Sequence, residues 1–205
     1  TSVSSSLTIS FDQANIYTVS GNILCAWARE TTHLSKRPIE FQQLYNDQYT
    51  GSTAKLEYSS VVISNDGNFL YIVASDVDTN EGVVYVFSRS QSDGGLEKGK
   101  KLTKDKNGLR SLVVSPDNQH LYALATDVTT NEQYLIMWER DGQLAEDPKI
   151  FMVSAPPQKA REITISPDGR NVYLVTSDST ASGTNLVHWS RDTNGKLNRQ
   201  TTVNL

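Results

Sequence analysis

A repeat of about 51 residues constrains this chain more than any other feature. Six positions of the repeat carry the same or a similar residue in its last three copies, and each copy lies 51 positions after the previous one. They are Ser64, Ser115 and Ser166; Asp66, Asp117 and Asp168; Tyr71, Tyr122 and Tyr173; Asp76, Asp127 and Asp178; Phe87, Trp138 and Trp189; and Arg89, Arg140 and Arg191. An earlier, looser copy places Ser10, Asp12 and Tyr17 54 positions before their counterparts, and Trp27 and Arg29 60 positions before theirs. The pattern predicts four copies of one structural unit.

Each copy contains four short runs that are typical of β-strands. In the last copy they are residues 162–166, 171–176, 185–190 and 197–203. The first run alternates apolar and polar residues and the second is a continuous apolar run, whereas the fourth is polar and rich in Thr, as an outer edge strand would be. Gly, Pro, Asn and Asp separate the runs, as tight turns require.

Four-stranded units that recur every 40–50 residues or so indicate the blades of a β-propeller. We therefore expect an all-β fold with four antiparallel blades, at residues 3–57, 58–108, 109–159 and 160–205. Four blades could close into a ring, or they could form part of a larger ring completed by a longer parent chain or by a second copy. The sequence begins Thr-Ser-Val without Met, which favours a processed product or a piece of a larger protein.

The repeat also resembles that of a known family. Ser166-Pro167-Asp168-Gly169, then Val172-Tyr173, then Val187–Asp192 and Asn194–Leu197 are similar to the repeat of the lactonase-like (phosphogluconolactonase-type, or YVTN) β-propellers. The similarity extends over nearly the whole chain, most clearly over residues 60–197. It implies a propeller fold and leaves function open, because the family includes hydrolases, surface-layer proteins and domains without known activity. Its lactonases resemble closed rings of seven blades, whereas this chain holds four repeats.

Composition excludes several classes of protein. A net charge of -4 and a pI near 5.4 argue against nucleic-acid binding, which needs a basic surface. No apolar run reaches the roughly 18 residues of a transmembrane helix. Cys25 is the only cysteine, so an intrachain disulfide is excluded, and its apolar neighbours predict a small buried side chain.

Most of the repeated side chains are expected to be structural, because a functional group is usually needed once. The Ser hydroxyls should bond the backbone across the tight turns, and the aromatic residues should fill the space between blades. The Arg residues should form ion pairs or cap carbonyl groups between blades, with an anion-binding ring as the alternative. The repeated Ser residues have no His at a repeated offset, so nucleophilic catalysis is not predicted.

The loops that follow the second strand of each repeat differ most between copies, so we expect any specific binding there. Their candidate binding residues are Asp76, Asp78, Asn80, Glu81, Asp127, Asn131, Glu132 and Asp178. Alternating oxygens in the first loop suggest calcium, but Glu81 and Phe87 occupy the places of the EF-hand Gly and Glu. We therefore expect Asx-type turns on an acidic rim, with no metal and no cofactor.

Two functions remain open. The first is a non-enzymatic interaction module that binds a protein or a glycan through these loops, exported rather than cytoplasmic, without nucleic acid, and with a homodimer or a longer parent chain completing the ring. It depends on the lack of a nucleophile–base pair, since His33, His120 and His188 occupy different repeat positions. The alternative, implied by the family resemblance, is a hydrolase of sugar lactones, for which Glu81, Glu132, Asp76 and Asp127 are candidate acids. Calcium-dependent adhesion is a third alternative.

Overall fold

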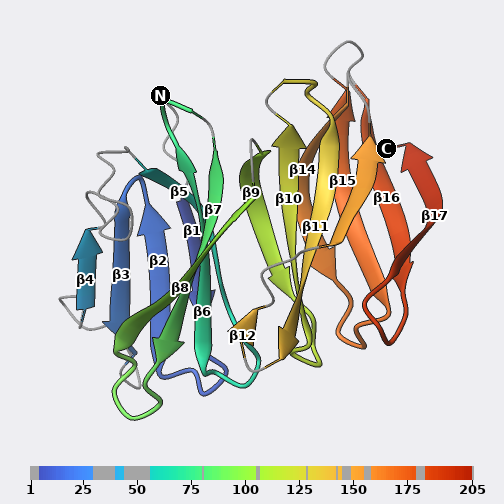
Figure 1. The fold of residues 1–205 in the computed structure, drawn as a ribbon. Helices are drawn as coiled ribbons and strands as arrows, with labels where there is room; N and C mark the ends of the chain where they lie inside the picture. Colours follow the sequence, from blue (N-terminus) through green and yellow to red (C-terminus); the bar gives the residue numbers. More distant parts are fainter. Residues whose placement is uncertain are drawn as a thin grey trace. The chain divides into compact units, whose positions relative to one another are not determined.

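The computed structural model describes residues 5–29, 40–43, 56–79, 81–104, 107–127, 129–141, 143–144, 149–154, 158–178 and 183–204. All of its regular structure is β-strand, in four antiparallel sheets that each use consecutive strands of the chain (Figure 1). The chain divides into two compact units, Thr1–Leu109 and Arg110–Leu205, which are described separately. The described residues include no helix that is long and apolar enough to cross a membrane.

The first unit contains two sheets. The strands of the first are β1 (Ser5–Ile9), β2 (Asn15–Ser20), β3 (Ile23–Ala28) and β4 (Glu40–Gln43). Those of the second are β5 (Leu56–Ile63), β6 (Phe69–Asp76), β7 (Gly82–Arg89) and β8 (Leu96–Lys104). Neighbouring strands in the chain pair in the order β1-β2-β3-β4 and β5-β6-β7-β8. This is the four-stranded meander of a propeller blade.

The second unit repeats this arrangement. Its first sheet contains β9 (Asn107–Val114), β10 (His120–Asp127), β11 (Gln133–Asp141), β12 (Gln143–Leu144) and β13 (Lys149–Ser154). Its second contains β14 (Gln158–Ile165), β15 (Asn171–Asp178), β16 (Thr184–Arg191) and β17 (Leu197–Asn204). Both β12 and β13 pair with the same edge of β11, so both lie at the outer edge of this blade.

The predicted fold is confirmed: the chain is an all-β propeller of four antiparallel blades. The apolar second and third strands are its core. Every residue of β7 except Ser88 is buried, and the core of β6 is buried on both faces. The last strand, β17, buries only Leu197, which is the pattern expected for a polar edge strand.

The tight turn between the first two strands of each sheet has the same geometry in all four copies. The residue three positions after the repeated Ser has a positive φ in every copy. These residues are Gln13 (58°), Gly67 (72°), Asn118 (59°) and Gly169 (70°). The Ser hydroxyl accepts a backbone N–H across the turn, from Asn15 to Ser10 at 2.9 Å and from Asn171 to Ser166 at 3.0 Å. The predicted structural role of these serines is confirmed.

Candidate functional site

In two of the predicted binding loops, the first Asp accepts hydrogen bonds from backbone N–H groups of the same loop. The Oδ1 atom of Asp76 accepts the backbone N–H groups of Asp78 (2.8 Å) and Thr79 (3.0 Å). Asp127 does the same for Thr129 and Thr130, at 2.7 and 2.9 Å. These are the expected Asx-type turns, and they satisfy one oxygen of each carboxylate within the loop.

The other candidate residues of these loops have different surroundings. In the third repeat, Glu132 accepts hydrogen bonds from the hydroxyls of Thr130 and Tyr134, which raises the pKa of Tyr134. Asn131 has a φ of 60° and bonds back to the Asp127 carbonyl, so the structure brings these three predicted residues into one turn. Asp78 and Glu81 are exposed. Asn80 lies outside the described residues, as does the side chain of Asp178. A ligand role for all eight residues stays a prediction.

No group of three or more His, Cys, Asp and Glu side chains is arranged to hold a metal ion in the residues that the structure describes.

The opposite end of the sheets carries a denser set of polar contacts, centred on the repeated arginines. Arg89, at the end of β7, is 6% exposed and reaches into the preceding sheet. Its Nε donates to the Tyr17 hydroxyl at 2.7 Å, and its Nη2 donates to Asp12 at 2.9 Å and Asn15 at 2.7 Å. Its Nη1 donates to the Gly67 carbonyl in its own sheet at 3.1 Å. We call this set of contacts an arginine staple.

A second arginine staple joins the two sheets of the other unit. Arg191 donates to the Tyr122 hydroxyl (2.9 Å), to Asp117 (2.8 Å) and to the Gly169 carbonyl (3.1 Å). His120 takes the place of Asn15, with its Nδ1 2.6 Å from the Arg191 Nη2. The expectation of ion pairs between blades is therefore confirmed at both arginines, and the carbonyl that each one caps lies in its own sheet.

The staples shift the pKa values of their partners. The hydrogen bond from Ser10, followed by those from Ala14 and Arg89, lowers the pKa of Asp12 to about 2 despite partial burial. Burial opposes the shift at Asp117, yet the bonds from Ser115, Gln119 and Arg191 lower its pKa to about 2. Burial raises the pKa of Tyr122 to about 12. Both carboxylates are therefore ionised at neutral pH, as an ion pair requires.

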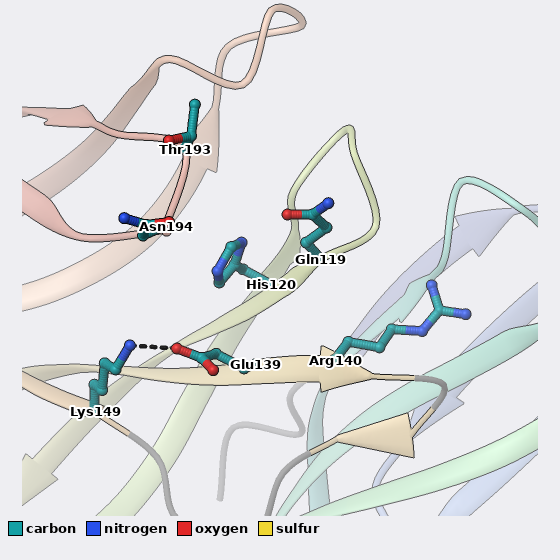
Figure 2. Close-up of a pocket in the computed structure, with 7 residues that line it drawn as sticks. All are labelled: Gln119, His120, Glu139, Arg140, Lys149, Thr193 and Asn194. Atoms are coloured by element: carbon teal, nitrogen blue, oxygen red, sulfur yellow. Dashed lines mark hydrogen bonds and ion pairs between the residues drawn. The ribbon is translucent and has the colours of Figure 1, made fainter.

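A pocket of about 540 Å³ opens beside the second staple. Its lining is polar and comes from the turn before β10, from β11 and β13, and from the turn between β16 and β17 (Figure 2). The lining residues are Gln119, His120, Glu139, Arg140, Lys149, Thr193 and Asn194. This pocket lies in the second unit, at the end that carries the Ser-x-Asp turns and away from the predicted binding loops.

Two of the charged side chains in this pocket form a pair, and the third points away from them. The Glu139 carboxylate is paired with the Lys149 ammonium, whose hydrogen bond and charge lower the pKa of Glu139. Both side chains are about half exposed, at 52% and 56%. Arg140 points away from this pair (Figure 2) and donates to the Asn118 carbonyl at 3.3 Å. The pocket therefore presents an ionised carboxylate beside an ammonium group.

His120 forms the buried wall of the pocket and is 4% exposed. Burial, and then the positive charge of Arg191, lower the pKa of the imidazole, so the ring is neutral at pH 7. With Nδ1 facing the Arg191 guanidinium, the acceptor must be Nδ1 and the proton lies on Nε2. His120 is therefore occupied by the staple and is a poor candidate for a general base.

The pocket differs from the other repeats at two titratable side chains, Glu139 and His120. Glu139 stands where the other copies have Ala28, Ser88 and Ser190, 51 positions from each serine. His120 stands where they have Asn15, Phe69 and Asn171. Reasoning from recurring residues and from the loops does not find this pocket. A search for charged residues that break the repeat inside strands would have found Glu139.

A groove of the second sheet shares two repeat positions with this pocket, those of Ser88 and Arg89. It measures about 520 Å³ and is lined by Ser88, Arg89, Ser90, Asp93, Gly95, Leu96 and Glu97. Ser88 replaces Glu139 there, and Arg89 is used by the staple. At the shared positions, the third repeat has a carboxylate where the second repeat has Ser88, and Lys149 pairs with that carboxylate.

The sequence matches no protein-family model, and the search of curated proteins finds no relative. Solved structures do share the fold. The periplasmic gluconolactonase of Pseudomonas aeruginosa is 18% identical with a TM-score of 0.67, and the match covers 97% of this chain and 56% of that one. A 6-phosphogluconolactonase candidate from Bacteroides uniformis is 16% identical with a TM-score of 0.62, over 92% of this chain and 54% of that one.

A protein from Sulfolobus tokodaii, named as selenium-binding, is similar to the same degree, with 11% identity and a TM-score of 0.66 over 97% of this chain and 54% of that one. This chain therefore spans about half the length of the structures that it matches. The likeness confirms the fold that the family resemblance implied, that of the lactonase-like propellers. At these identities the likeness carries the fold alone.

Proposed function

We propose that this chain belongs to a hydrolase that acts on sugar lactones. The observation that carries the proposal is the Glu139–Lys149 pair, which breaks the repeat inside a polar pocket. The fold supports it, since two proteins named as sugar lactonases share the fold. Because the chain spans about half the length of these structures, the activity is proposed for the assembled propeller.

The chemistry of a lactone fits the groups in the pocket. A lactone is a cyclic ester, and a carboxylate can take a proton from the water that attacks its carbonyl carbon. Glu139 is the ionised carboxylate, and the Lys149 ammonium beside it can stabilise the oxyanion that forms. The ring oxygen then leaves and takes the proton that the carboxylate removed from the water, and the product is the open-chain hydroxy acid. The Gln119 and Asn194 side chains supply hydrogen bonds for sugar hydroxyls.

A second candidate is binding without turnover, in an interaction module that holds a protein or a glycan. It is favoured by the low pKa of Glu139, since a weakly basic carboxylate is a poor general base, and by the use of His120 in the staple. In that case the pocket would hold a hydroxylated or acidic ligand through the same polar groups. The periplasmic neighbour favours an extracytoplasmic location for either function.

The test is hydrolysis of glucono-δ-lactone, followed at constant pH by the acid that it releases. We expect a rate above spontaneous hydrolysis and a loss of about 100-fold in kcat/KM for Glu139→Gln, the usual size of a general-base effect. Glu97→Gln, in the groove of the second sheet, is the matched control and should keep full activity.

The outcome separates the two candidates. A rate no higher than the spontaneous one, together with calorimetric binding of gluconate that Lys149→Gln weakens by removing the ammonium, would favour the binding module. If the protein shows no turnover and also does not bind gluconate, both candidates are contradicted. Equal losses in Glu139→Gln and Glu97→Gln would show that the carboxylate acts through general charge alone.

A further inference from the structure

Each unit shows how two successive blades pack. In the first unit, Val61 from the first strand of the second sheet is 2% exposed and belongs to the same core as Tyr17 and Leu24 of the first sheet. In the second unit, Ile163 from β14 is packed in the same way with Tyr122. The first strand of a blade therefore presents its apolar face to the second and third strands of the blade before it. We call these two surfaces the leading and the trailing face.

The leading face of the first sheet is uncovered. Leu7 is 69% exposed and Ile9 is 44% exposed, whereas the counterparts of Leu7 in the other repeats are buried. Those counterparts are Val61 (2%), Leu112 (4%) and Ile163 (5%). Trp27 is also only half-buried, in contrast to Phe87, Trp138 and Trp189. Phe11, in the turn after β1, is also exposed, at 80%.

The trailing face of the last sheet is open too. Its four apolar or aromatic positions are half-buried: Tyr173, Val175, Leu186 and His188. Their counterparts in the third repeat, Tyr122, Leu124, Leu135 and Met137, are between 0% and 2% exposed. The two end sheets thus present one leading and one trailing face of the kinds that pack together inside each unit.

Half an arginine staple accompanies each open face. Arg29 occupies the staple position of the first repeat, but it is exposed, and among the bonds of the described residues its guanidinium donates only to Gln13 in its own sheet. Asp168 occupies the acceptor position of the last repeat and is exposed, with bonds from Ser166 and the Arg170 N–H. The structure thus has a donor at one end and an acceptor at the other.

We propose that these faces form a head-to-tail interface between two copies of this chain, in which Arg29 of one copy bonds to Asp168 and Tyr173 of the other. The charges are complementary, and the apolar residues are those that already pack between blades. Two copies would also approximate the length of the solved propellers, about half of which one copy spans. A pair closed by two such interfaces leaves neither apolar end face in water.

Mass in solution, measured by sedimentation or light scattering, tests the pairing. The expected value for the unmodified protein is twice 22.7 kDa. Arg29→Asp and Asp168→Arg each place like charges across both interfaces, so each variant alone should dissociate, with a dissociation constant raised by about 100-fold. Asp78→Arg makes the same charge change as Asp168→Arg on an exposed loop and should keep the pair.

Mixing the two variants is the decisive arm. When one copy carries Arg29→Asp and the other carries Asp168→Arg, the two substituted side chains pair opposite charges at one interface. The unchanged residues pair at the other interface, so the mixture should regain the double mass. A monomeric unmodified protein at micromolar concentration would overturn the proposal, as would a mixture of folded variants that stays monomeric. A mass of three or more copies would contradict a closed pair.

Discussion

At the scale of single residues, His120 shows how a functional-looking side chain can be explained by structure. It is one of three histidines in the chain, it lies in a pocket, and its pKa is lowered by burial and by Arg191. These properties are typical of catalytic histidines. Here, however, the ring takes the place of Asn15 as acceptor for the staple, which accounts for its burial and its neutral state.

We predict that His120→Asn, which introduces the residue found at Asn15 and Asn171, reduces the acid sensitivity of the fold. The folded-state pKa of His120 lies below its ordinary value of 6.5, so the unfolded chain binds a proton first as pH falls. The stability given by the neutral ring is therefore present above pH 6.5 and is lost below it. Nearby Asp117 and Glu139 partly offset this effect.

Urea unfolding at pH 7.5 and at pH 5 measures the effect. The unmodified protein should lose more free energy of unfolding between these pH values than His120→Asn does. An equal loss in both proteins would show that the ring can be protonated in the folded state and that the staple does not hold it neutral.

Repetition determines which residues can be predicted from sequence. The repeated Ser, Tyr and Arg side chains are correctly interpreted as structural, because four copies of a group rarely serve one site. Glu139 is missed because the sequence alone does not show which turn lies beside this strand residue and forms a pocket with it. Lys149 reaches it from β13, which pairs with β11 as the later part of β8 pairs with β7.

At the scale of elements, the turn between the third and fourth strands locks the second sheet of each unit to the first. The Tyr17 hydroxyl donates to the Gly94 carbonyl at 2.9 Å, and the Tyr122 hydroxyl donates to the Gly195 carbonyl at the same distance. Both glycines have positive φ, 77° and 75°. A Cβ atom at either one would lie closer than 3.0 Å to the side chain of Asn15 or of His120. The repeated Asp-Gly or Asn-Gly turn, Asp93-Gly94 and Asn194-Gly195, is thus a packing element.

Gly195→Ala should therefore destabilise the protein by about 2 to 4 kcal/mol, from left-handed backbone strain together with overpacking against His120. Gly183→Ala is the matched control, since a Cβ atom there meets nothing within 4 Å. We expect its free energy of unfolding to stay within about 0.5 kcal/mol of the unmodified value. Urea unfolding of the two variants side by side compares them, and equal costs would contradict the turn contact.

The strands themselves follow closely from the sequence, with one exception. The periodicity predicts four strands in the last repeat at 162–166, 171–176, 185–190 and 197–203, and the structure has them slightly longer. In the third repeat Leu144 pairs with Arg140, as Leu96 pairs with Arg89, and the outer edge is described as two strands, β12 and β13, where the other repeats have one. Sequence spacing gives the first pair of an edge strand, and only packing decides where the strand continues.

At the scale of the whole molecule, the shared and the divergent parts of the repeats have different tasks. Within each unit, staples, glycine turns and apolar faces join successive blades, and these features recur. The charged pair in the pocket occurs in one repeat and contributes little to the core, because both side chains are half exposed. We infer that departures from the repeat carry function while the repeat carries stability.

The most direct test is Glu139→Ser, which restores the residue that Ser88 and Ser190 occupy in the neighbouring repeats. The measurement is kcat/KM for glucono-δ-lactone together with the Tm of the same preparation. We predict a loss of activity of about 100-fold and a Tm within about 2 °C of the unmodified protein, as for other surface substitutions. Full activity, or a Tm lowered by about 8 °C or more, would contradict this division between function and stability.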